Sequence, residues 1–168
     1  EMATFGDERN HGMVPIVQTS KGTLISGAPQ TNAPVPVGVP GSMVRGLRST
    51  DDGKTWQALR VFPHFGVAGY DLTVLTNDWI VLTYIVYGIG HDGEYSYEVV
   101  VSRDDGKTWD FDGAVEVHNP RRRIMVRGWP RTVQIDAETL GTVFYDLEQN
   151  QPGGPGVFIV QTSLARIS

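Results

Sequence analysis

The chain has 168 residues, no cysteine and a formal net charge of −5. This length suits one domain, the lack of cysteine excludes disulfides and thiolate metal sites, and the negative charge disfavours nonspecific binding to nucleic acid. Its 20 glycines and 10 prolines favour short strands and turns over long helices. No apolar run approaches the roughly 20 residues that a membrane-spanning helix needs, so no membrane partner is predicted.

Short alternating apolar runs follow one another along the chain and are separated by turn signals. The first unit has runs at residues 14–19, 23–28, 42–48 and 57–62. The second unit has runs at residues 71–76, 79–86, 95–101 and 110–117. A third unit has runs at residues 131–136, 140–147 and 156–167. Four-stranded antiparallel units that recur about every fifty residues are typical of a β-propeller.

We therefore expect an all-β fold in which residues 1–168 form a single β-propeller segment of four-stranded antiparallel blades. The blades are expected at approximately 1–62, 63–117 and 118–168, and the third ends before a fourth strand.

One phrase occurs twice, as STDDGKTW at residues 49–56 and as SRDDGKTW at residues 102–109. It falls between the third and fourth strands of each complete unit. The first aspartate of each phrase can accept hydrogen bonds from its own turn, and the glycine can adopt a positive φ that side chains resist. A catalytic site rarely occurs twice in one fold, and an EF-hand calcium loop needs more oxygen ligands. The phrase therefore predicts a structural hairpin turn whose tryptophan ring is buried between strands or blades.

The pattern Ser-x-Asp-x-Gly-x-x-Trp resembles the Asp-box of the sialidase-like (BNR-repeat) β-propellers. Its residues here are Ser49, Asp51, Gly53 and Trp56, and then Ser102, Asp104, Gly106 and Trp109. The tail GWPRTVQIDAETLGTVFYDL, residues 128–147, resembles the closing blade of bacterial sialidase-family proteins. The resemblance covers residues 12–165 and implies the C-terminal half of a six-bladed ring. Such a ring would be closed by the remainder of the same propeller or by a second copy of the chain.

Strands that run up and down place successive turns on opposite faces of a propeller. The repeated phrases lie on one face, and the longer loops, where function tends to reside, lie on the other. All four histidines, at positions 11, 64, 91 and 118, fall on the second face. Imidazoles suit a metal site there, but loop histidines are more often simple polar residues, so no metal and no cofactor is predicted. His64 and His91 are candidate substrate contacts.

Five arginines fall between residues 121 and 131. A guanidinium group binds a carboxylate through two hydrogen bonds, and the resemblance implies a clamp of arginines around an acidic sugar. Arg131, at the mouth of the third inner strand, and the nearby Arg127 are the candidate carboxylate ligands. The run at residues 121–123 is equally well explained as a solvated loop. Trp129 is expected either to stack on a sugar ring or to pack between blades.

Asp71, at the mouth of the second inner strand, is the candidate acid–base residue because a carboxylate there faces the central cavity. A strand-end cap is the alternative. The resemblance implies a tyrosine nucleophile with a carboxylate partner. Tyr70 is the candidate nucleophile, and Glu148 or Glu94 is the candidate partner.

These residues together predict an extracellular or periplasmic glycoside hydrolase of the sialidase type, exo-acting on acidic glycans. The alternative is a noncatalytic propeller module that binds glycan or protein.

Overall fold

The computed structural model describes residues 15–30, 43–61, 70–87, 95–118, 130–146 and 156–167. Within these ranges the chain is almost entirely β-strand, and the one helix is the short 3-10 helix η1 (Leu164–Arg166). No helix in the same ranges has the length and apolar character needed to cross a membrane.

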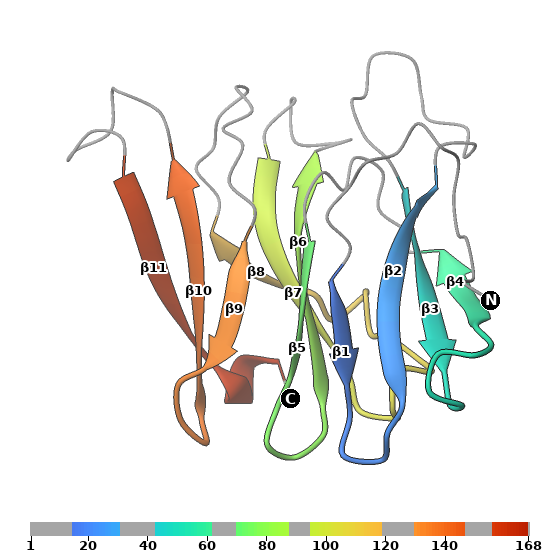
Figure 1. Ribbon diagram of the computed structural model, residues 1–168. Helices are drawn as coiled ribbons and strands as arrows, with labels where there is room; N and C mark the ends of the chain where they lie inside the picture. The colour runs from blue at the N-terminus through green and yellow to red at the C-terminus, as the bar shows by residue number, and fades with distance from the viewer. Residues whose placement is uncertain are drawn as a thin grey trace.

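Three antiparallel sheets stand side by side, and each follows the order of the chain (Figure 1). Blade 1 consists of β1 (Ile16–Gln18), β2 (Leu24–Gln30), β3 (Met43–Ser49) and β4 (Gln57–Val61). Blade 2 consists of β5 (Tyr70–Val74), β6 (Ile80–Tyr87), β7 (Tyr95–Ser102) and β8 (Val115–His118). Blade 3 consists of β9 (Arg131–Gln134), β10 (Thr139–Asp146) and β11 (Gly156–Ser163). The predicted four-stranded antiparallel units are confirmed.

The first strand of each blade is its inner strand. Strand β5 contacts β1 on one side and β9 on the other, and Figure 1 shows these three strands next to one another. The turns that join β1 to β2, β5 to β6 and β9 to β10 lie on one face, together with the turn between β3 and β4. We call this the turn face. The mouths of the inner strands, where β5 and β9 begin, lie on the opposite face.

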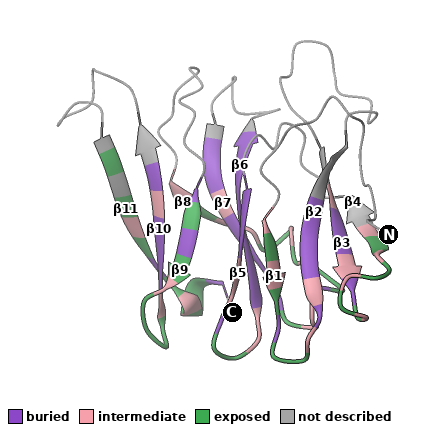
Figure 2. Cartoon of the chain, in the orientation of Figure 1, coloured by how far each residue is buried: buried purple, intermediate pink, exposed green. Residues whose placement is uncertain are grey.

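Strands β5, β6 and β7 of blade 2 are covered on both sides, and Figure 2 shows that most of their described residues are buried. Leu72, Ile80 and Leu82 form a cluster with Ile25 of blade 1. Residues on the other side of the same strands, such as Val81 and Val99, form a second cluster with blade 3. Side chains alternate between the two sides of a strand, so a strand covered on both sides has to be apolar throughout. This explains the nearly unbroken apolar run of β6.

Blade 3 has one covered side and one open side. Four large apolar side chains on its open side are exposed, namely Val133, Ile135, Val157 and Ile159. The strand register places them on the same surface, opposite the side that packs on blade 2.

Several observed strands are shorter than the sequence suggests, and two of them differ most. Residues 156–167 were expected to form one strand, but β11 ends at Ser163, whose Oγ accepts a hydrogen bond from the backbone of Ala165 at 3.2 Å. Ser163 thereby caps η1. Strand β8 begins only at Val115, because Asp110 accepts a hydrogen bond from the backbone N–H of Gly113 at 3.0 Å and holds a turn there.

Candidate functional site

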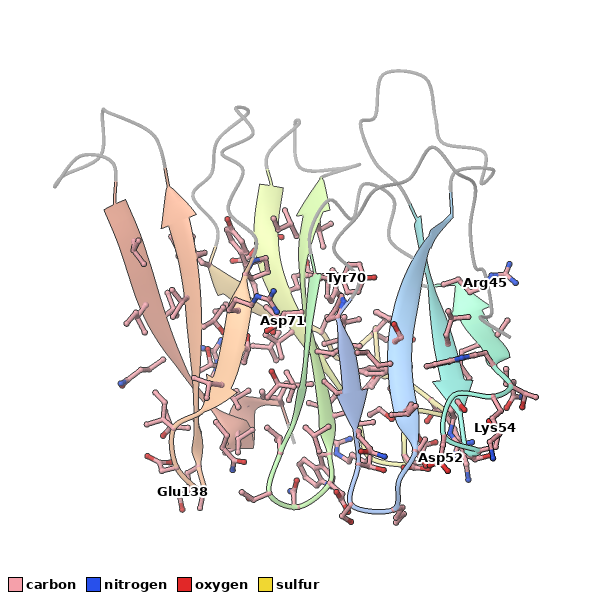
Figure 3. All side chains as sticks on the ribbon, in the orientation of Figure 1. Arg45, Asp52, Lys54, Tyr70, Asp71 and Glu138 are labelled. Carbon is pink, nitrogen blue, oxygen red and sulfur yellow. The ribbon has the colours of Figure 1, made fainter. Side chains whose placement is uncertain are left out.

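The mouths of β5 and β9 bring together two predicted site residues that are 60 positions apart in sequence. The Nη1 atom of Arg131 donates a hydrogen bond to Oδ1 of Asp71 at 2.8 Å. The two side chains differ in exposure, because that of Arg131 is 62% exposed and that of Asp71 is 6% exposed. Figure 3 shows Asp71 beside Tyr70 at the start of the central inner strand. The pair is therefore a buried carboxylate that holds an exposed guanidinium group.

Asp71 is fixed by the backbone of the next blade. Its Oδ2 accepts a hydrogen bond from the backbone N–H of Thr132 at 2.8 Å. The Thr73 hydroxyl donates to the carbonyl oxygen of Thr132 at 2.6 Å. An inner strand lies at the edge of its sheet. Its N–H and C=O groups on the side without a neighbouring strand therefore need other hydrogen-bond partners. Side chains of blade 2 supply these partners for β9, and both carboxylate oxygens of Asp71 are bonded as a result.

Three threonine hydroxyls continue this polar seam into the core. The Thr83 and Thr132 hydroxyl oxygens are 2.7 Å apart, and those of Thr132 and Thr142 are 3.0 Å apart. All three residues are buried, so the hydroxyls satisfy one another between blades 2 and 3. Sequence reasoning missed them because a threonine on a strand carries no sign of which neighbour it faces.

Within the described residues, Arg131 keeps guanidinium donors that a ligand could use. A guanidinium group carries five N–H donors in a rigid fork, and the hydrogen bond to Asp71 uses one of them. An arginine held in place at one end loses less conformational entropy when it binds a planar anion or a pair of hydroxyl groups. The arrangement can therefore orient a polar ligand beside the propeller axis.

Tyr70 lies on the other side of β5 and faces blade 1. Its hydroxyl donates a hydrogen bond to the carbonyl oxygen of Gly27 at 2.9 Å, and the residue is 8% exposed. Burial raises the pKa of Tyr70 well above its ordinary value of 10.0. A phenol held in this way is stabilised in its neutral form. Its role as a nucleophile stays a prediction, and the contacts described here join two blades.

Several predicted site residues lie outside the described residues, so their positions are not part of the geometry above. They are Glu148, Arg127, Trp129, His64 and His91. Among the described residues no group of three or more histidine, aspartate or glutamate side chains could hold a metal ion. His118, in β8, has its ring stacked on that of Phe144 with 4.7 Å between the ring centres.

The two repeated phrases form the same turn on the turn face, as predicted. In each copy the serine hydroxyl accepts a hydrogen bond from the glycine N–H at 3.0 Å. The first aspartate accepts one from the threonine N–H at 2.9 Å. The glycines have φ values of 80° and 79°, which confirms the expected left-handed conformation.

The hydrogen bonds of these turns stabilise the ionised carboxylates. Those from the side chain and backbone of Thr55, followed by that of Ser49, lower the pKa of Asp51 to about 2. Burial by itself would raise the pKa of Asp104, but the hydrogen bonds from Thr108 and Ser102 outweigh it and lower the pKa. A carboxylate that accepts its hydrogen bonds from residues of its own turn is suited to stabilising that turn.

Trp56 covers the first of these turns. Its indole Nε1 donates to the carbonyl oxygen of Gly53 at 3.0 Å, and the ring is half-buried. Trp109 packs at the same place on the blade 1–blade 2 cluster. Trp109 therefore packs between blades, partly buried, whereas Trp56 is half-buried on its own turn and the predicted burial between strands or blades is not seen for it among the described residues.

Comparison with known proteins gives structural matches alone. No protein-family model matches the chain, and no curated protein matches it by sequence. The α-L-arabinofuranosidase Arb93A of Fusarium graminearum superposes with a TM-score of 0.68 and 20% sequence identity, over 89% of this chain and 44% of the enzyme. The α-L-arabinanase of Penicillium chrysogenum, solved with arabinobiose, gives 0.61 and 20% identity over 88% and 44%. The Hadza microbial sialidase Hz136 gives 0.57 and 14% identity over 89% and 30%.

These matches show the fold, which is that of a β-propeller segment. The chain spans less than half the length of each of these three proteins.

Proposed function

We propose that the chain is part of a glycoside hydrolase whose substrate binds at the mouths of the inner strands, with Arg131 as a ligand for the carboxylate of an acidic sugar. Propeller glycosidases among the structural matches, one solved with arabinobiose and one with an iminosugar inhibitor, support the glycosidase class. The acidic sugar is supported by the guanidinium chemistry of Arg131. We extend the proposal to an exo-acting enzyme of the sialidase type that works outside the cytoplasm.

The observation that carries this proposal is the pairing of Arg131 with Asp71. The carboxylate is buried and bonded through both oxygens, so its role here is to position the guanidinium group. The exposed face of Arg131 remains open to a ligand among the described residues. The acid and base of the reaction then have to come from other residues, for which Glu148 is the first candidate.

A noncatalytic glycan-binding module is the second candidate function. It is favoured by the same observation, because the predicted acid–base carboxylate and the predicted nucleophilic hydroxyl are both engaged between blades. A binding module needs an oriented arginine but no free acid or base. A fold shared with enzymes does not decide between the two functions.

A titration with N-acetylneuraminic acid and with its methyl ester tests the carboxylate contact. Arg131→Lys keeps the positive charge but loses the planar fork, so we expect the Kd for the acid to rise about tenfold while the Kd for the ester changes little. The matched control is Arg166→Lys, because Arg166 is exposed and lies in η1, outside the inner strands. Equal losses for acid and ester would count against a carboxylate ligand.

Hydrolysis separates the two candidate functions. The chain is incubated with the chromogenic α-sialoside and α-L-arabinofuranoside of 4-nitrophenol. Turnover that Arg131→Lys reduces on the sialoside supports the enzyme. Binding of N-acetylneuraminic acid without release of nitrophenol supports the binding module.

A further inference from the structure

The second aspartate of the second repeated phrase joins blade 2 to blade 1. Asp105 accepts hydrogen bonds from the hydroxyls of Thr19 at 3.0 Å and Thr23 at 2.7 Å. The guanidinium group of Arg48 donates to its carboxylate at 2.5 Å and to its carbonyl oxygen at 2.9 Å. The side chains of Arg48 and Asp105 are 13% and 11% exposed. One carboxylate of blade 2 therefore accepts hydrogen bonds from two hydroxyls and pairs with one cation, all from the preceding blade.

The glycine that follows this aspartate is covered by the same blade. A Cβ atom placed on Gly106 would lie 2.4 Å from Cδ1 of Ile25, a residue of β2 in blade 1. Real Cβ atoms do not approach that closely, so Ile25 occupies the space that a side chain would need. Asp105 and Gly106 together form a docking site for the preceding blade.

The first phrase repeats this site, and among the described residues no other blade contributes a contact to it. Asp52 and Gly53 have φ values of 57° and 80°, close to the 64° and 79° of Asp105 and Gly106. Asp52 is exposed, and Figure 3 shows it at the edge of the molecule on the turn face. No hydrogen bond or ion pair of its side chain occurs within the described part of the chain, and the nearest neighbours of a Cβ on Gly53 are Leu24 and Trp56 of its own blade.

We propose that Asp52 and Gly53 are the docking site for a further blade that precedes blade 1 in the ring. That blade presents a hydroxyl at the end of its first strand, a second hydroxyl four residues later and an arginine next to the end of its third strand. These are the positions of Thr19, Thr23 and Arg48 in blade 1. A branched aliphatic residue at the position of Ile25 covers Gly53. The inference concerns ring assembly and does not depend on the proposed function.

A second copy of this chain does not supply that chemistry. In a ring of two copies, blade 3 of one copy precedes blade 1 of the other. Matching turn hydrogen bonds place Ile135 and Thr139 of blade 3 at the positions of Thr19 and Thr23, and matching strand register places Gln161 at that of Arg48. Asp52 would then be buried without a cation, which is unfavourable. The occupant is therefore a blade of other polypeptide that carries the arginine.

The chain can be given such a blade from its own sequence. A second copy of residues 15–69, which hold blade 1 and the segment that follows it, is fused ahead of residue 15. The added copy then supplies Thr19, Thr23 and Arg48 to the blade that follows it. Below, Asp52 means the aspartate of that following blade, which is the original blade 1. We expect Asp52→Asn to lower the urea midpoint of this extended chain by as much as Asp105→Asn does, and to leave the midpoint of the 168-residue chain unchanged. Arg48→Met in the added copy alone should remove the effect of Asp52→Asn.

Crosslinking checks the placement independently, and the chain offers a background without cysteine. An extended chain that carries both Thr23→Cys in the added blade and Asp52→Cys in the following blade is treated with a short bis-maleimide. The positive control is Thr23→Cys with Asp105→Cys in the unextended chain, and the negative control replaces Asp52→Cys by Asp112→Cys on an exposed turn.

Each outcome decides the proposal. Crosslinking as efficient as in the positive control, together with the midpoint shift, supports it. Failure to crosslink, or an Asp52→Asn variant of the extended chain with an unchanged midpoint, overturns it. A crosslinked dimer of the unextended chain through Asp52→Cys and Thr139→Cys would show that a second copy occupies the site, and would overturn it as well.

Discussion

Replacing Asp105 by asparagine tests how the blades are held together. Asparagine has nearly the same shape and tolerates the positive φ of 64° found at this position. The substitution therefore removes the charge without adding backbone strain. The oxygen of the new amide can still accept from Arg48 and Thr23, while its NH2 group can donate to the Thr19 hydroxyl, which then acts as an acceptor.

The expected loss of stability comes from the negative charge, which the amide of asparagine lacks. A hydrogen bond to a charged group contributes about 1.5–3 kcal/mol, and breaking a buried ion pair by complete removal of one partner costs about 3–5 kcal/mol. Because asparagine keeps an acceptor, we expect a loss of about 2 kcal/mol. For a chain of this length that corresponds to a melting temperature lower by about 4–8 °C.

The pH dependence has a definite sign. Burial by itself would raise the pKa of Asp105, but the hydrogen bonds from Thr23, Arg48 and Thr19 and the charge of Arg48 outweigh it and lower the pKa. A lowered pKa in the folded state contributes stability that is present above the ordinary value of 3.8 and is lost as the pH falls below it. The difference in unfolding free energy between the native chain and Asp105→Asn should therefore become smaller in acid.

Urea unfolding followed by tryptophan fluorescence at neutral and acidic pH measures both effects. The matched control is Asp52→Asn, since Asp52 occupies the same position in the other repeated turn with a similar φ but is exposed. We expect that control to leave stability unchanged. The reasoning is refuted if the two variants lose equal stability, or if Asp105→Asn loses none.

Three further tests, with four substitutions, probe the turns and the inner strand. Asp51→Ala should lower the melting temperature, since it removes the acceptor of its own turn, while the rate of any hydrolysis per folded molecule stays the same; a lower rate at an unchanged melting temperature would contradict a structural role. Tyr70→Phe should cost about 1 kcal/mol in a denaturant titration by removing one hydrogen bond, and loss of all hydrolysis without loss of stability would instead support a nucleophile. Gly106→Ala should destabilise more than Gly53→Ala in the same titration, because both have a positive φ but only Gly106 lies against Ile25 of another blade; equal losses would show that this contact is unimportant.

The strands and repeated turns were predictable because their determinants are local. The alternation of apolar residues and the spacing of Ser49, Asp51 and Gly53 lie within a few positions of one another, and the turn hydrogen bonds form within the same few positions. The exceptions are also local, since neither the capping by Ser163 that ends β11 nor the Asp110 turn that delays β8 was recognised.

The contacts between blades were not predictable in the same way. Asp71 was expected either to face the central cavity or to cap the end of a strand, and neither prediction identified the bond that its carboxylate accepts from the backbone of Thr132 in the next blade. The sequence indicated a role for the first aspartate of each phrase, and Asp104 does hold the turn. It indicated no role for the second aspartate, yet Asp105 binds Thr23 and Arg48 of blade 1. Which side chain meets which depends on how far each blade is rotated and shifted against the next, and no residue of a single blade encodes that relation.

The two blade junctions nevertheless differ in a way that fixes the order of the blades. At the junction of blades 1 and 2 the turn face is polar, with Thr19, Thr23 and Arg48 around Asp105. At the junction of blades 2 and 3 the structurally equivalent residues are Leu75, Trp79 and Val101.

These apolar residues pack on Leu164 and Ile167, which follow β11 where a third repeated phrase would otherwise begin. If the order were exchanged, the carboxylate of Asp105 would be buried against Leu75 and Val101, and burying an unpaired charge among apolar groups is strongly unfavourable. Asp105 therefore fits the polar residues of blade 1 and not the apolar residues of blade 2. The same chemistry gives Asp52, at the open side of blade 1, a preference for a blade of the polar kind.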